Sequence, residues 1–164
     1  MAAMSDFLEN KLIDWFFRAQ AIGITGATAA AGTGPANLYI GLLTAAPDDT
    51  KTGASVTEVA NAGNYARVGV VSSMTASGWA GTQSAGSTAA SSGTGGTTSN
   101  NGAITFGAPS ANWGVVSHFG IFDSGTWGAG NLLFWGALTA SKTVNNGDAA
   151  PSFAAAALSI QIDN

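Results

Sequence analysis

The chain has 164 residues, a formal net charge of −4 and no cysteine, and charged residues make up only 9% of it. Its length suits one domain with a real core, because a chain of about 150 residues buries roughly two thirds of its unfolded surface. The acidic balance argues against nucleic acid or an anionic membrane as a partner. The lack of cysteine excludes disulfides, thiolate metal sites and thiol catalysis.

Residues 5–20 are predicted to form the one clear helix, with Asp6 as its N-cap. Lys11, Asp14 and Arg18 fall on one side of this helix, which we interpret as its polar side. The apolar arc on the other side is wider than one contact surface needs, so packing within the domain and packing between subunits are both open. The apolar candidates for assembly contacts are Leu8, Leu12, Trp15, Phe16 and Phe17.

The rest of the chain is predicted to be β. Residues 21–36 are expected to be a linker and residues 37–164 an antiparallel, jelly-roll-like β-sandwich, because short strand patterns follow one another without intervening helices. The predicted fold class is therefore mainly β with one N-terminal amphipathic α-helix. The expected strands are residues 38–44, 65–71, 103–106, 115–122, 132–138 and 158–162.

Two neighbouring strands, residues 115–122 and 132–138, are apolar on both faces. Exposing each large apolar side chain forfeits roughly 1.5–3 kcal/mol, which a marginally stable domain cannot lose several times over. The sheet around Phe119 and Phe134 is thus expected to need cover from another copy or from a particle wall. This pattern predicts a homo-oligomer, and we take a trimer as the expected state.

Two tryptophans lie among small polar residues. Trp79 lies near the start of an insertion, residues 77–102, that is made almost entirely of Ser, Thr, Gly, Ala and Asn and in isolation would be a flexible loop. Trp127 lies in the loop between the two apolar strands. An exposed indole can anchor a protein partner or stack on a sugar ring. Burial under their own loops is the first alternative for both residues, followed by contact with a partner and then by contact with a glycan on the exterior.

The sequence offers little catalytic chemistry. His118, the sole histidine, lies in an apolar strand, where a structural imidazole is expected rather than a catalytic base. Asp48, Asp49 and Glu58, like residues 145–148, carry oxygen ligands without the spacing of a calcium loop, so turn capping explains them better. We predict no catalytic residue, no metal and no cofactor, and no enzymatic activity.

No targeting segment is expected. The first apolar run is interrupted by charged side chains, so neither a signal peptide nor a membrane span fits it. A product made in the bacterial cytoplasm, without a membrane partner, is the default expectation.

In the order and spacing of its motifs the chain resembles a family of small structural proteins of tailed bacteriophages. The resemblance covers nearly the whole chain, departs from the family at residues 77–102 and Trp127, and implies a β-rich virion component. Such proteins are usually tail-fibre or minor virion proteins, and some of similar size decorate the head. The matching segments are residues 6–10, LYIGLLTAAP at 38–47, 58–59, 65–67, 103–106, 113–114, HFGIFD at 118–123, GNLLFWGAL at 130–138 and KTVNNGD at 142–148.

Together these observations predict a non-enzymatic structural component of a phage virion, a trimeric fibre or decoration protein on the particle exterior. Its expected partners are its own copies and other virion proteins of the capsid, neck or tail. A receptor-recognition module that binds a host glycan through Trp79 and Trp127 is the alternative. A hydrolase that depends on His118 is a third and more remote hypothesis.

Overall fold

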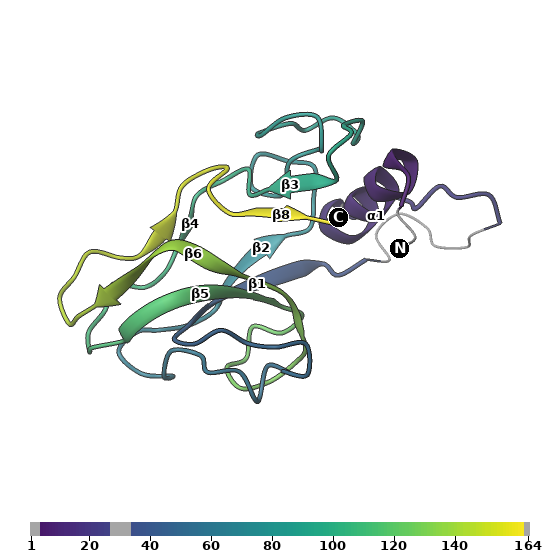
Figure 1. Ribbon diagram of the computed structural model, residues 1–164. Helices are drawn as coiled ribbons and strands as arrows, with labels where there is room; N and C mark the ends of the chain where they lie inside the picture. The colour runs from purple at the N-terminus through teal and green to yellow at the C-terminus, as the bar shows by residue number, and fades with distance from the viewer. Residues whose placement is uncertain (1–3, 27–33, 163–164) are drawn as a thin grey trace. The chain divides into compact units, whose positions relative to one another are not determined.

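A computed structural model describes residues 4–26 and 34–162, so part of the predicted linker, residues 27–33, lies outside the described residues. The described chain is mainly β with one N-terminal helix, which confirms the predicted fold class (Figure 1). The strand pairs β1–β5, β3–β8 and β5–β6 are antiparallel, as expected. The elements are α1 (Asp6–Arg18), β1 (Asn37–Leu43), β2 (Val68–Val71), β3 (Thr97–Ser99), β4 (Ile104–Thr105), β5 (Gly114–Phe122), β6 (Leu132–Val144), β7 (Ser152–Phe153) and β8 (Ser159–Gln161).

The chain forms two compact units. One, the helix unit, combines the N-terminal segment through Asn37 with Val70–Ile104 and the segment from Phe153 onward. The other, the sheet unit, combines Leu38–Gly69 with Thr105–Ser152. The division at residues 20 and 36 that the sequence suggested stays a prediction.

Helix α1 lies within the predicted residues 5–20, but its N-cap is one residue earlier than expected. Ser5, not Asp6, is the N-cap, and its hydroxyl accepts a hydrogen bond from the backbone N–H of Leu8 at 3.5 Å. Asp6 is the first helical residue, where its negative charge favours the positive end of the helix dipole. The helix ends at Arg18 because Ala19 turns into the left-handed region with φ 53°.

The small-residue insertion, residues 77–102, is folded within the helix unit. It contributes β3, which pairs with β8 from Thr97↔Gln161 to Ser99↔Ser159. A further bridge joins Trp79 to Asn100. A segment that looked like a flexible loop therefore has backbone partners in its own unit.

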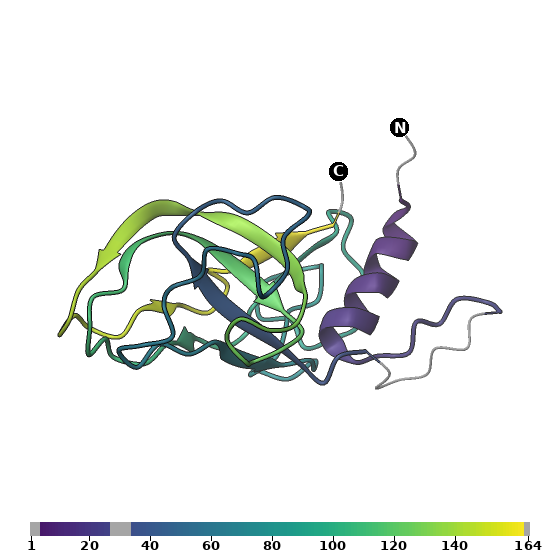
Figure 2. The same cartoon turned by 90° about the horizontal axis from the view of Figure 1, so that it is seen from below.

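The main sheet has the strand order β2-β1-β5-β6, and Figures 1 and 2 both show β5 and β6 as a long neighbouring pair. The inner strands are covered on both faces, since Ile40 and Ile121 on one face and Leu43 and Phe122 on the other have 0% exposure. Both faces of β5 are therefore covered at these positions, but Val115 at its start is 50% exposed and Phe119 is half-buried. On the edge strand β6, Trp135 is 41% exposed, so the expected need for cover from another copy stays a prediction.

Candidate functional site

Helix α1 turns its charged side inward. Arg18 has 0% exposure, and its guanidinium forms an ion pair with Asp14 one turn earlier. The same guanidinium donates to the backbone carbonyls of Trp79 and Ala89 and to the hydroxyl of Ser91. Two of the three residues of the predicted polar side, Asp14 and Arg18, are thus buried, because the insertion supplies hydrogen-bond partners that replace water.

The insertion is held to α1 by further polar contacts. The Asp14 carboxylate accepts hydrogen bonds from the backbone N–H of Ser91 at 3.0 Å and from its hydroxyl at 2.6 Å. Asn10 donates to the carbonyl of Gly93 at 2.9 Å and accepts from the hydroxyl of Thr82. Small polar residues thus order this segment through hydrogen bonds rather than through apolar burial.

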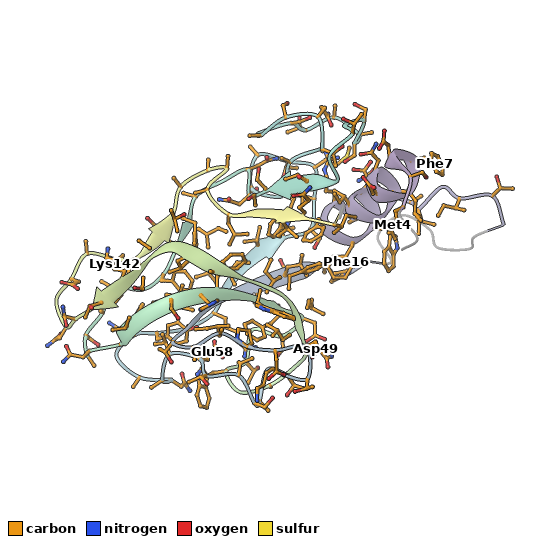
Figure 3. The ribbon with its side chains drawn as sticks, viewed as in Figure 1. Met4, Phe7, Phe16, Asp49, Glu58 and Lys142 are labelled. Carbon is orange, nitrogen blue, oxygen red and sulfur yellow. The ribbon has the colours of Figure 1, made fainter. Side chains whose placement is uncertain are left out.

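The apolar side of α1 remains partly open. Phe7 is 57% exposed and projects outward from the helix in Figure 3, and Met4, just before the helix, is 39% exposed. Lys11 holds its ammonium 5.7 Å from the centre of the Phe7 ring. We call the exposed and half-buried residues of this side the helix stripe; Met4 and Phe7 are exposed, and Leu8, Lys11, Leu12, Trp15 and Phe16 are half-buried.

The structure sorts the predicted assembly candidates. Phe17 is 1% exposed and packs against Trp79 with ring centres 5.1 Å apart, so it belongs to the core of the helix unit. The other four candidates lie on the helix stripe. Sequence reasoning missed Phe7 and Met4 because it took the assembly candidates only from the apolar residues that begin at Leu8.

The two loop tryptophans differ sharply. Trp79 has 0% exposure, which removes it from the candidates for exterior contact and agrees with burial under its own loop. Trp127 is 43% exposed, and its indole N–H donates to the carbonyl of Val59 at 2.8 Å. The hydrogen bond fixes the orientation of the Trp127 ring while leaving much of its surface open.

A second buried arginine organises the sheet unit. Arg67 pairs with Glu58, with an N–O distance of 2.7 Å, and its side chain has 0% exposure. Its guanidinium lies 3.6 Å from the centre of the Phe122 ring and donates to the carbonyls of Ser124 and Ala129 at 2.8 and 2.9 Å. Glu58 is therefore neither a turn cap nor a metal ligand but half of an internal ion pair.

Tyr65 completes this centre. Its hydroxyl donates to Glu58 at 2.7 Å and accepts from the backbone N–H of Leu42 at 2.8 Å. Burial raises the pKa of the Tyr65 phenol, and the negative charge of Glu58 raises it further. The phenol therefore stays protonated and remains a donor to Glu58 at every physiological pH.

Asp48 and Asp148 cap turns. Asp48 accepts from the backbone N–H of Thr50 at 3.0 Å, and hydrogen bonds from the side chain and backbone of Thr50 lower the pKa of Asp48. Asp148 accepts from the backbone N–H of Asn145 at 2.8 Å. Turn capping is confirmed for these two carboxylates. Within the described ranges, no cluster of three or more His, Asp or Glu residues has the arrangement of a metal site.

His118 is half-buried on β5, with Nδ1 2.9 Å from the Ser117 hydroxyl. Within residues 4–26 and 34–162 no carboxylate forms an ion pair with this ring. A catalytic triad needs a carboxylate that orients the histidine, and the contacts of His118 do not provide one. In the same part of the chain, α1 is too short and too polar to cross a bilayer.

Comparison with known proteins settles the family. The family described as Podophage GP4 fiber I protein gp80 matches residues 3–161. The chain belongs to this family. It is thus a structural protein of a phage fibre, and as a fibre protein it is a component of the virion. No curated protein sequence matches the chain.

Proposed function

We propose that this fibre protein is a non-enzymatic structural subunit that assembles as a trimer on the particle exterior and contacts other virion proteins through the helix stripe. The observation that carries the proposal is the orientation of α1. Its charged residues Asp14 and Arg18 are satisfied inside the chain, whereas Phe7 is 57% exposed. A helix that buries its ion pair and exposes an aromatic side chain is suited to docking onto another protein.

The energetics favour cover for this surface. Burying a large apolar side chain contributes about 1.5–3 kcal/mol. Cover of Phe7, Met4 and the half-buried residues of the stripe by a partner therefore adds several such contributions to the free energy of binding. Lys11 is the single charged residue of the stripe, and its ammonium already lies over the Phe7 ring. A partner can therefore bury the stripe without leaving a buried carboxylate unpaired.

Light scattering coupled to size-exclusion chromatography tests the proposal. We expect a mass of three chains of 16.2 kDa each, or a whole multiple of that mass, for the natural protein and a smaller mass for Phe7→Asp. Asp in the first turn suits the helix dipole, so this variant keeps α1 folded. Ala54→Asp adds the same charge at an exposed site of the sheet unit and should leave the mass unchanged.

A stable monomer of the natural protein that also fails to bind particles lacking it would overturn the proposal. The number of copies on each particle then decides the location. A few dozen copies or fewer correspond to a fibre at the neck or tail, and hundreds of copies to decoration of the head. Synthesis in the host cytoplasm before assembly is part of the same proposal.

Trp127 supports a second candidate function, recognition of a host glycan. The indole is 43% exposed, and its N–H is already bound to Val59, which presents a fixed aromatic face of the kind on which sugar rings stack. Binding to a glycan array that Trp127→Ala abolishes and Trp127→Phe partly retains supports this function. Equal binding by the natural protein and Trp127→Ala argues against it.

A further inference from the structure

The edge of the main sheet offers a second surface for contact between copies. Strand β6 (Leu132–Val144) is the last strand in the order β2-β1-β5-β6. An edge strand presents unpaired backbone N–H and C=O groups, and natural proteins protect such edges with charges, proline or bulges. The presence or absence of these devices on β6 therefore indicates whether its edge can pair with another strand.

The segment Phe134–Ala137 lacks charge and proline and is in regular register with β5, from His118↔Ala137 to Ile121↔Phe134. Register shifts bound this segment on both sides, so the bulges that protect the β6 edge lie outside these four residues. Bulges next to a regular stretch fix where a partner strand can pair, because pairing cannot slide past them. Trp135, in the middle, is 41% exposed and Ala137 is also exposed.

Charge favours a second copy in antiparallel orientation. The charged residues nearest the two ends of the segment are Asp123, which binds the backbone and side chain of Asn131 at 2.7 Å, and Lys142, labelled in Figure 3. Antiparallel pairing brings the Lys142 end of one copy to the Asp123 end of the other. Parallel pairing would place like charges at the same end and would not close.

We infer that the β6 edges of two copies pair antiparallel about a two-fold axis at Trp135. This register covers each exposed indole with its own copy, and an aromatic pair of this kind adds favourable energy beyond the buried area. It also places Phe134 opposite Gly136 of the second copy. The chain already uses that combination internally, where Phe119 lies opposite Gly136.

A two-fold contact does not close within a trimer, so this contact joins copies that belong to two different trimers. It is separate from the helix stripe, and the two contacts can be tested apart. The chain contains no cysteine, and a single introduced thiol therefore reports one position only. Residues directly opposite in an antiparallel pair have Cα atoms about 4.5–5.5 Å apart, which suits a disulfide. Trp135→Cys is consequently expected to form a covalent dimer of the full-length chain under mild oxidation.

Ala137→Cys is the matched control. Ala137 is exposed on the same face of β6 as Trp135, but in the proposed register it lies opposite Leu133 of the second copy. The two introduced thiols of this variant are therefore separated by four residues, about 13 Å. We expect at least about tenfold more covalent dimer from Trp135→Cys than from Ala137→Cys, because only the former gains a high effective concentration. Circular dichroism establishes that both variants are folded.

Repeating the oxidation in the Phe7→Asp background separates the two contacts. Covalent dimers of Trp135→Cys in that background support an edge contact that does not depend on the helix stripe. Little dimer from Trp135→Cys, or equal amounts from both cysteine variants, overturns the edge contact. If the natural oligomer persists in that case, the proposed function stands without it.

Discussion

The helix unit and the sheet unit are each organised by one buried arginine, and Arg18 and Arg67 are the only arginines in the sequence. Arg18 gathers loop carbonyls and a serine hydroxyl around α1, whereas Arg67 pairs with both oxygens of Glu58 and stacks on Phe122. The comparison teaches that a chain poor in charge can use its few cations as internal cross-links between loops that have little apolar surface.

The two centres differ in how strongly the buried carboxylate relies on its arginine. Around Arg67, the Glu58 carboxylate is nearly inaccessible, with 2% side-chain exposure, and its other donor is Tyr65. Around Arg18, the Asp14 carboxylate also accepts from the backbone and hydroxyl of Ser91. Loss of Arg67 therefore strands a buried charge more completely than loss of Arg18 does.

The largest expected effect is that of Arg67→Met. The substitution preserves much of the apolar stem but leaves Glu58 buried without its cation, which costs about 3–5 kcal/mol of unfolding free energy. Urea unfolding followed by fluorescence measures the loss. Lys142→Met removes the same charge from an exposed site and should change stability little. A loss below about 1 kcal/mol for Arg67→Met would show that the centre is not a cross-link.

Arg18→Met is expected to cost less, about 2–3 kcal/mol, because Asp14 keeps its bonds to Ser91. The effect should be local, with faster amide exchange in residues 77–102 and little change in the sheet unit. Lys11→Met, on the same helix, is the control for loss of one positive charge. Equal acceleration of exchange in both units would contradict two separately organised centres.

The sequence predicted the elements better than it predicted the contacts. Short apolar runs bounded by Gly, Asn, Pro or Ser located β1, β5 and β6 to within a residue at their starts, since such runs are a local property of the sequence. The burial of Asp14 and Arg18 was not predicted, because they were interpreted as part of a polar side, and no local pattern shows that carbonyls 61 and 71 residues after Arg18 will accept its hydrogen bonds. Only the scarcity of charge could have signalled that these side chains have partners inside the chain.

The candidate site shows the same limit. Four of the five predicted helix residues lie on the helix stripe, but the buried Phe17 and Trp79 form a pair that neither local sequence reveals. The Ser/Thr/Gly insertion looked flexible because it has little apolar surface to bury. Its order comes from hydrogen bonds to α1, and these depend on tertiary structure.

Tyr65→Phe tests the electrostatics of the sheet unit with a smaller effect. Loss of the hydroxyl removes a donor to Glu58 and the acceptor for Leu42, for a cost of about 1–2 kcal/mol at neutral pH. Because the folded pKa of Tyr65 is raised, its contribution is complete below the unfolded pKa of about 10 and is lost as the pH rises above it. Unfolding midpoints between pH 8 and pH 11 should thus fall less steeply for Tyr65→Phe than for the natural protein. Parallel curves would mean that Tyr65 ionises equally in both states.

The smallest expected effect lies at the start of α1. Ser5→Ala removes the side-chain cap, and because the bond to Leu8 is long at 3.5 Å, the cost should be near the low end of the usual range, about 0.5 kcal/mol. Ser5→Asp restores a capping oxygen beside the helix dipole and should show no loss. Amide exchange at Leu8 measures both variants, with the sheet unit as internal reference. A cost for Ser5→Ala that reached the sheet unit would mean that the two arginine centres unfold together.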